Sequence, residues 1–209
     1  MTRKEMASPQ SAMFDRLANG YDRGMAPLEW LWFRTLRQRL LPRVQGKVLE
    51  MGIGTGANLP FYPNGPCVFG LDESAEMLAS STGRAQSLGR CLRLSQAIAE
   101  QLPFADGTFD TVLGSLVLCS VNNPHRALRE VKRVLRKPGG QLLLLEHTRP
   151  DSPLLARLTD VINGPWYTLN GRCNVNRRTG QMVAEAGFYL DSIESHLGGL
   201  LRLIIAHSG

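Results

Sequence analysis

Apolar residues follow two rhythms along this chain. After Gly46, short and almost continuously apolar runs alternate with longer segments in which apolar residues recur every three or four positions. Continuous runs are typical of strands buried on both faces of a sheet, and the longer period is typical of helices that cover it. The pattern therefore predicts an α/β fold with a mostly parallel sheet of seven strands and helices on both faces. The expected strands are residues 47–52, 67–72, 90–100, 110–118, 141–148, 188–197 and 200–209.

Helical spacing fills the intervals between these strands. The segment 74–89 begins with Ser74 two residues ahead of Glu76, which is a helix-start pattern. Segments 123–140 and 178–186 are expected to be the next two helices. The last two strands are joined through Gly198-Gly199, which predicts a hairpin and hence an antiparallel last strand.

The N-terminal part differs from the rest of the chain. Residues 1–10 are expected to be a disordered lead and residues 11–45 a helical cap, followed by the main domain at 46–209. In the second cap helix, Leu28, Trp32, Leu36 and Leu40 recur at helical spacing, while Arg34, Arg37 and Gln38 cluster on another side. No interdomain linker or repeat appears, so we expect a single compact domain.

Composition narrows the class of protein. With 209 residues, 43% hydrophobic and 20% charged, the chain is typical of an ordinary globular protein. It has no apolar run long enough to cross a bilayer and no signal-peptide pattern, so a cytoplasmic location is expected. The spacing of its four cysteines suits a reducing compartment and argues against a disulfide framework and against a zinc site. These are Cys67, Cys91, Cys119 and Cys173.

A formal net charge of +6 leaves several partners open. It fits a solvated basic face, an anionic membrane surface or an acidic substrate, whereas no nucleic-acid-binding motif is present and no nucleic-acid partner is expected. Trp30, Trp32 and Phe33 stand among arginines at 34, 37, 39 and 43. This helix either lies on an anionic membrane or caps the sheet and lines an apolar pocket. Both interpretations indicate a small or lipid-like substrate.

The stretch LEMGIGTGANLPFYP carries the main candidate site. Gly52, Gly54 and Gly56 follow a strand and precede an expected helix, a place where the backbone can approach a ligand closely. Asp72 ends the next strand, where a carboxylate can accept both ribose hydroxyls. With Ala57 as its last residue the run also fits a dinucleotide fingerprint, so the glycines alone do not separate NAD from S-adenosylmethionine.

Three further features favour S-adenosylmethionine. Glu50 lies two residues before the first glycine and suits a ligand with a cationic end rather than a pyrophosphate. The segment 99–115, AEQLPFADGTFDTVLGS, is expected to face the adenine and the methionine amine. The antiparallel last strand is unlike a dinucleotide-binding fold. An NAD-dependent oxidoreductase and a non-catalytic binding protein are the alternatives from other classes.

Four segments in order, VLEMGIGTG, GLDES, AEQLPFADGTFD and LREVKRVLRKPGGQLLLLEH, resemble class I S-adenosylmethionine-dependent methyltransferases of the UbiE-like group over residues 14–207. The resemblance implies a Rossmann-like sheet and this cofactor, and no metal site is predicted. Within the group, GTGANLPFYP and GPWYTLNGRCNVNRRT are similar to thiol methyltransferase-like proteins, and the first is also similar to bacterial phospholipid N-methyltransferases.

The resemblance also implies cofactor contacts. Glu50 and the three glycines would surround the methionine half, and Asp72 would hold the ribose. Ile98 stands where many members have an aspartate or asparagine, so adenine would be held by backbone and apolar contacts. The remaining implied cofactor residues are Met77, Ala97, Ala99, Ser115 and Leu116.

Methyl transfer from a sulfonium mainly requires alignment of the acceptor and exclusion of water, so no catalytic triad is expected. Glu146 and His147 directly follow the fifth strand and are candidates for a base or an orienting group. Tyr21 resembles the family's lid element. Simple packing is the alternative for Tyr21, a structural hydrogen bond for His147 and an inert side chain for Cys119 and Cys173. A thiol is the preferred acceptor, followed by an aminophospholipid and a quinone ring; the oligomeric state is not predicted.

Overall fold

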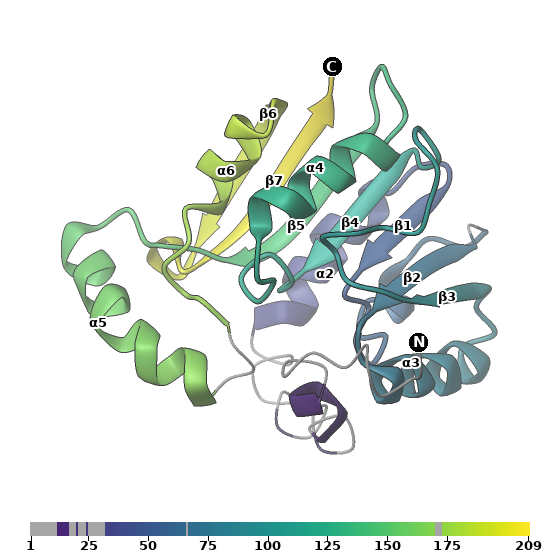
Figure 1. Cartoon of the computed structure of the whole chain (residues 1–209), viewed down its shortest axis with the longest axis horizontal. Coiled ribbons are helices and arrows are strands. Elements are labelled where there is room, and N and C mark those ends of the chain that lie inside the picture. Colours follow the sequence, from purple (N-terminus) through teal and green to yellow (C-terminus); the bar gives the residue numbers. More distant parts are fainter. Residues whose placement is uncertain (1–11, 17–19, 21–23, 25–31, 66, 170–172) are drawn as a thin grey trace.

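A seven-stranded sheet runs through the molecule (Figure 1). The computed structural model describes residues 12–16, 20, 24, 32–65, 67–169 and 173–209. The strand order is β3-β2-β1-β4-β5-β7-β6, and β7 pairs antiparallel with both β5 and β6 while the other pairs are parallel. The predicted mostly parallel sheet with an antiparallel last strand is confirmed. The strands are β1 (Val48–Met51), β2 (Val68–Asp72), β3 (Leu92–Gln96), β4 (Thr111–Ser115), β5 (Gln141–His147), β6 (Phe188–His196) and β7 (Leu201–Ser208).

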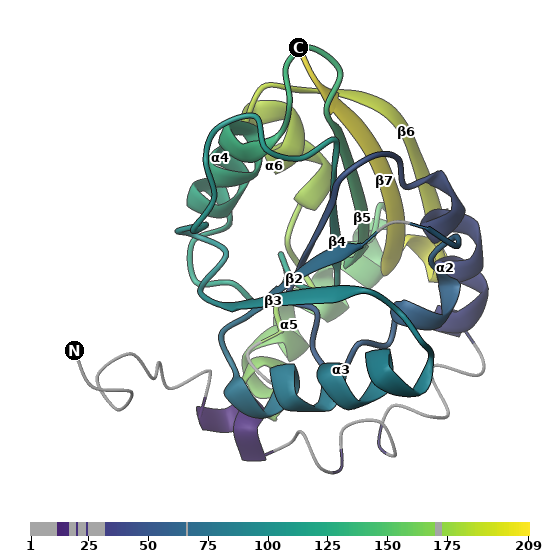
Figure 2. The same ribbon diagram turned by 90° about the vertical axis from the view of Figure 1, so that its right-hand side faces the viewer.

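The two faces of the sheet bury two separate cores. Along β5, Leu142 and Leu144 belong to one hydrophobic cluster and Leu143 and Leu145 to the other, because successive side chains of a strand point to opposite faces. Helices α4 (Pro124–Val134) and α6 (Thr179–Glu185) cover the first face, and α2 (Arg34–Leu40) and α3 (Ala75–Ser87) contribute to the second (Figure 2). Each fully buried leucine contributes about 1.5–3 kcal/mol, so strands that are apolar throughout require helices on both faces.

Local sequence signals explain where α3 and α4 begin. The Ser74 side chain accepts a hydrogen bond from the Met77 N–H at 3.1 Å, and the Asn123 side chain accepts one from the Arg126 N–H at 3.0 Å. Pro124 occupies the first turn of α4, where its missing N–H costs no helical hydrogen bond. Both predicted helix starts are confirmed.

The N-terminal cap is described in part. Residues 12–16 are helical, and α2 continues into the 3-10 helix η2 (Leu41–Arg43). Leu36 and Leu40 are buried as predicted, but Phe33 is 2% exposed and Trp32 is 43% exposed, so Phe33 takes the place expected for Trp32. The predicted lead at 1–10, together with Tyr21 and Trp30, lies outside the described residues.

The arginines of α2 and η2 do not form one solvated face. Arg37 is only 5% exposed, contrary to its expected place away from the buried leucines. Arg39 and Arg43 form ion pairs with Glu194 on β6 at 3.4 and 3.9 Å. These contacts tie the cap to the sheet edge. Within the part of the chain that the structure describes, no helix has the length and apolar character needed to cross a membrane.

Two elements differ from the sequence prediction. The helix expected directly after the glycine run is replaced by turns and a 3-10 helix, η3 (Leu59–Phe61), because Pro60 and Pro63 interrupt helical hydrogen bonding there. A long helix that was not predicted, α5 (Pro153–Leu169), follows β5. Figure 1 shows α5 at the end of the sheet toward which the parallel strands point.

The prediction that the chain has no disulfide is wrong. Cys67 and Cys91 are joined by a disulfide across a sequence separation of 24 residues. Each lies directly before a strand, and the register pairs Val68 with Leu92, so the two cysteines enter the sheet side by side. Sequence spacing could not reveal this pairing, because only the register of β2 against β3 creates it.

Candidate active site

A cavity of about 1550 Å³ opens at the carboxyl ends of the parallel strands. Open α/β sheets bind ligands at this edge. The cavity has two ends, one beside β2 and β1 and the other beside β5 and β7. Strand β4 lies between these two pairs of strands. Of the predicted site residues, Gly56 and Glu146 do not line the cavity and Tyr21 lies outside the described residues. Those that line it are Glu50, Gly52, Gly54, Asp72, Met77, Ala97, Ile98, Ala99, Ser115, Leu116 and His147.

The glycine run forms a turn that only glycine adopts without strain. Gly52, Gly54 and Gly56 have φ values of +57°, +55° and +78°. A Cβ at Gly52 would lie 2.5 Å from the side chain of Val117, and one at Gly56 would lie 2.7 Å from the side chain of Leu59. Gly52 and Gly56 therefore allow close packing against Val117 and Leu59, whereas a Cβ at Gly54 would meet no atom nearer than 4.0 Å.

Asp72 is fixed by the same turn. One of its carboxylate oxygens accepts the Gly54 N–H and the other accepts the Ser74 N–H, both at 2.9 Å. Burial raises the pKa of Asp72 above its usual value, and these backbone hydrogen bonds oppose the increase. A carboxylate has lone pairs beyond the two in use, so Asp72 can still accept hydrogen bonds from two ligand hydroxyls.

Glu50 is almost fully enclosed, with 1% of its surface exposed. Its two oxygens accept hydrogen bonds from Asn58 Nδ2 at 2.7 Å and from the Tyr62 hydroxyl at 2.8 Å. Burial raises the pKa of Glu50 to about 7, although these hydrogen bonds and the charge of Arg37 lower it. Glu50 therefore takes up or releases its proton near neutrality, and a cationic ligand beside it would favour the ionised form.

Arg37 links the cap to this network. Its guanidinium donates a hydrogen bond to Asn58 Oδ1, and Asn58 Nδ2 also donates to Ser115 Oγ at 3.0 Å. Sequence reasoning missed Arg37, Asn58 and Tyr62. Asn58 and Tyr62 belong to the stretch ANLPFYP, which directly follows the glycines. Their place next to the glycine turn could have indicated that they lie near the site.

The wall between β2 and the segment after β3 is mainly apolar. Met77 is 2% exposed and Ala99 is 6% exposed, while Ile98 is 42% exposed. The Ala97 N–H donates to the Asp72 carbonyl at 3.1 Å and holds this segment beside β2. An apolar wall of this kind can pack against the face of a flat aromatic ring such as adenine.

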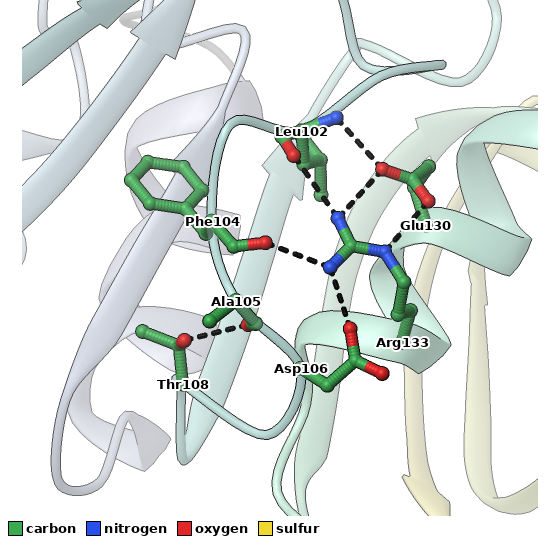
Figure 3. Close-up of polar contacts among 7 residues, drawn as sticks. All are labelled: Leu102, Phe104, Ala105, Asp106, Thr108, Glu130 and Arg133. Carbon is green, nitrogen blue, oxygen red and sulfur yellow. Dashed lines mark hydrogen bonds and ion pairs between the residues drawn. The ribbon is translucent and has the colours of Figure 1, made fainter.

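Most of the segment 99–115 has a different role from the one predicted. Arg133 on α4 donates to the carbonyls of Phe104 at 2.7 Å and Leu102 at 3.0 Å, and it forms ion pairs with Asp106 and Glu130 (Figure 3). Only Ala99, Glu100 and Ser115 of the segment line the cavity. LPFADG is thus a structural loop held from outside the site.

Glu146 supports the loop after β4 rather than facing a ligand. Its carboxylate accepts the backbone N–H groups of Val117, Leu118 and Cys119 at 2.9, 2.7 and 3.1 Å. It is completely buried and does not line the cavity. Its position does not favour the predicted catalytic role, because both oxygens are already used to hold the backbone.

A strained residue follows strand β4 directly. Leu116 has a φ of +60°, and its N–H donates to the Leu145 carbonyl at 2.7 Å. Non-glycine residues in this region usually persist only where surrounding contacts impose them. The turn directs the chain from β4 into the loop that carries Cys119.

Three soft ligand groups meet at the β5 end of the cavity. Cys119, His147 and Cys173 come from three separate segments, their side-chain ligand atoms lie within 4.8 Å of one another, and all three line the cavity. Cys173 Sγ lies 3.3 Å from His147 Nδ1. The argument from cysteine spacing considered only ligands that are close in sequence and therefore did not include this cluster.

The cluster is polar as well as buried. The hydrogen bond with Cys173 and burial raise the pKa of Cys119 well above its usual value, and the hydrogen bond from Cys119 lowers the pKa of Cys173. Burial lowers the pKa of His147, but its hydrogen bond with Cys119 and the charges of Cys119 and Glu146 leave it raised overall. Cys173 is therefore the more readily ionised thiol.

Comparison with known proteins agrees with this arrangement. A family described as a methyltransferase domain matches residues 49–144. Human thiol S-methyltransferase TMT1A is 35% identical over 173 residues, which cover 80% of this chain and 70% of that protein. A phosphatidylethanolamine N-methyltransferase of Cereibacter sphaeroides is 40% identical over 114 residues, which cover 53% of this chain and 56% of that protein. The chain thus spans little more than half the length of the latter relative.

The fold is also shared with solved structures. A S-adenosylmethionine-dependent methyltransferase of Thermotoga maritima, described as a possible histamine N-methyltransferase, has a TM-score of 0.72 and 21% sequence identity. The match covers 95% of this chain and 99% of the other.

Proposed function

This chain belongs to the class I S-adenosylmethionine-dependent methyltransferases, and we propose that its methyl acceptor is the sulfur of a small, largely apolar thiol. The observation that carries the proposal is the lining of the cavity at its β5 end. There Cys119, His147 and Cys173 share the wall with aromatic and aliphatic side chains. The apolar lining residues are Trp32, Phe33, Leu116, Ile162, Trp166, Val175, Leu197, Leu200 and Leu201.

The β2–β1 end of the cavity fits the cofactor. When bound, the cofactor supplies a methyl group on a positively charged sulfur. We assign Asp72 to the ribose hydroxyls, because its carboxylate faces the cavity beside the glycine turn. Glu50 brings a carboxylate to the cationic end, and Met77 and Ala97–Ala99 form the wall for adenine.

The β5 end favours a polarisable, anionic nucleophile over an ammonium group. Asp72 and Glu50 lie on β2 and β1, and Glu146 does not line the cavity because its carboxylate accepts three backbone N–H groups. An aminophospholipid would bring an ammonium group to this end, where His147 and two thiols line the wall. A thiolate is compatible with these groups, because sulfur and imidazole hydrogen bonds stabilise negative charge.

The surroundings of His147 also suit an apolar acceptor. The Phe33 ring packs edge-on against the imidazole at 6.3 Å between centroids. Ile162 and Trp166 of α5 line the same end. On the outer side of α5, Leu154 and Val161 are 78% and 76% exposed, an apolar surface beside the cavity. An apolar wall of this kind favours an apolar acceptor and reduces the water around it, and both alignment and exclusion of water are main requirements of a methyl transfer.

The test is transfer of a labelled methyl group to three acceptor classes: alkyl and aryl thiols in solution, phosphatidylethanolamine vesicles, and a quinone precursor. We expect turnover of thiols without membranes. In the variant His147→Ala, kcat/KM for the thiol should fall about 100-fold while the cofactor Kd stays unchanged, because His147 lies at the acceptor end.

His125→Ala is the matched control, since His125 is exposed on α4 and does not line the cavity. It should retain full thiol turnover. Methylation of the phospholipid amine with no turnover of any thiol would overturn the proposal and leave the phospholipid enzyme as the function.

A further inference from the structure

We infer that Cys119, His147 and Cys173 form a binding site for a zinc ion whose fourth coordination position opens into the cavity. The inference deepens the proposed function, because an ion at this place would hold the acceptor sulfur as a thiolate; only that role rests on the proposed function. The binding of the ion itself follows from the chemistry and placement of the three side chains.

The ligand set is the one that zinc prefers. Two thiolates and one imidazole, with a free position, are typical of zinc sites that keep room for a further ligand. A tetrahedral zinc ion with Zn–S near 2.3 Å and Zn–N near 2.0 Å places its ligand atoms about 3.5–3.8 Å apart. Cys173 Sγ and His147 Nδ1 are 3.3 Å apart, and all three ligand atoms lie within 4.8 Å. Small side-chain movements are enough to coordinate an ion.

The segments that carry the cysteines are held together before any ion binds. The backbone N–H and the side-chain Nδ2 of Asn174 both donate to the Cys119 carbonyl, at 2.8 and 3.1 Å. On the other side, the Val175 N–H donates to Asn163 Oδ1 of α5 at 3.0 Å. A site prepared in this way loses less conformational entropy on binding.

Neighbouring groups fix the backbone around the ligands. The Glu146 carboxylate accepts the Cys119 N–H, and Arg177 donates to the carbonyls of Leu118 and Val121. Such outer contacts orient metal ligands in known sites. Two thiolates would balance the charge of Zn²⁺, and the charges of Glu146 and Arg177 balance each other. The loaded site would therefore be close to neutral in buried surroundings, which reduces its desolvation cost.

The fourth position has space for a ligand. Each of the three residues lines the cavity, together with Trp166 and Leu197. An ion there would present its open side to the acceptor end rather than to the protein interior. A zinc-bound thiol is deprotonated and remains nucleophilic, so the site would select a thiol over an amine or a ring carbon.

The experiment uses cobalt as a spectroscopic replacement for zinc in the full-length chain. The background is the variant C67S/C91S, in which Cys119 and Cys173 are the only remaining cysteines of the four. Free thiols are counted first to confirm that both are reduced. We expect one Co²⁺ per chain, with the strong absorption of cobalt–thiolate bonds and the weaker bands of tetrahedral cobalt, and displacement of Co²⁺ by Zn²⁺.

Single substitutions identify the ligands. In the same background, C119S, C173S and H147A should each weaken Zn²⁺ binding at least 100-fold, whereas H125A should not change it. Circular dichroism confirms folding of each variant. Absence of cobalt–thiolate absorption from the reduced chain would overturn the inference, as would absorption in C119S and C173S that is unchanged from that of the C67S/C91S background.

The two proposals fail separately. A chain that binds the ion but turns over no thiol contradicts the proposed acceptor and leaves the metal site intact. A chain that methylates thiols at full rate after chelation, and shows no cobalt–thiolate absorption, contradicts the metal site and leaves the acceptor intact.

Discussion

The two ends of the cavity are assembled in different ways. The cofactor end is formed mainly by residues close in sequence: Glu50, the glycine turn and Asp72 lie on β1, β2 and the connection between them. The other end brings together Cys119, His147 and Cys173, which lie on three segments and span 55 positions of the chain. A connection between adjacent parallel strands can be recognised as a motif, whereas a cluster formed by two loops and the end of a strand has no sequence period.

The two ends of the cavity also differ in the charge of the side chains that line them. At the cofactor end, two buried carboxylates are held by backbone N–H groups, an amide and a phenol. At the acceptor end, the wall consists of thiols, an imidazole and apolar rings. One end thus suits a ligand with hydroxyl and cationic groups, and the other suits a soft nucleophile. Substitutions at one end should therefore leave the other end unchanged.

The largest effect is expected for Asp72→Asn. The amide would direct an N–H₂ group toward either the Gly54 or the Ser74 N–H and would lose the charge that favours ribose hydroxyls. Calorimetry should show at least a 100-fold weaker cofactor affinity, equivalent to about 2.7 kcal/mol. Asp191→Asn, at an exposed position on β6, is the control and should bind normally. Normal cofactor affinity in D72N would contradict the assignment of the ribose site.

Arg133→Ala should have an effect of similar size, but on stability. The substitution removes hydrogen bonds to the carbonyls of Leu102 and Phe104 and to two carboxylates. Because the carbonyls lose their partner, the free energy of unfolding in urea should fall by about 2–3 kcal/mol. Arg136→Ala removes an exposed ion pair with Asp110 and should cost less than about 1 kcal/mol. Equal losses in the two variants would mean that the loop does not depend on Arg133.

A smaller, pH-dependent effect is expected from Glu50. With a pKa of about 7, it is mostly neutral at pH 6 and mostly ionised at pH 8. If the carboxylate pairs with the cationic end of the cofactor, affinity should rise by roughly tenfold between these pH values. Calorimetric titrations across this range should show the rise in the native chain and a flat profile in Glu50→Gln. A parallel rise in both would assign the pH dependence to another group.

The same pKa has a consequence for stability. An exposed glutamate has a pKa of 4.5, and the folded-state value is higher, so protonation favours the folded chain. The contribution of Glu50 is fully present below pH 4.5 and is lost as the pH rises through about 7. Urea unfolding of the native chain and of E50Q at pH 5 and pH 8 should show a larger loss in the native chain, because Asp72 and His147 also have raised pKa values and remain in both chains.

Much of the fold could be predicted from the sequence because its signals are local. Continuous apolar strands, the cap at Ser74 and the Gly198-Gly199 turn each act within a few residues, and the sheet with its antiparallel last strand followed from them. The helix α5 was missed because its apolar residues do not form one buried stripe: Leu154 and Val161 are exposed. The expected helix after the glycines was wrong because Pro60 and Pro63 outweigh the family pattern.

The sequence by itself determined the cofactor class, since Glu50, the glycines and Asp72 are adjacent along the chain and meet at adjacent strand ends. Only the tertiary structure decided the rest. The register of β2 and β3 paired Cys67 with Cys91, and the packing of α2 brought Arg37 to Asn58. The docking of the loop before α6 onto the loop after β4 placed Cys173 beside Cys119. Such contacts depend on how segments far apart in the sequence pack against each other, and the spacing of residues along the chain does not reveal this packing.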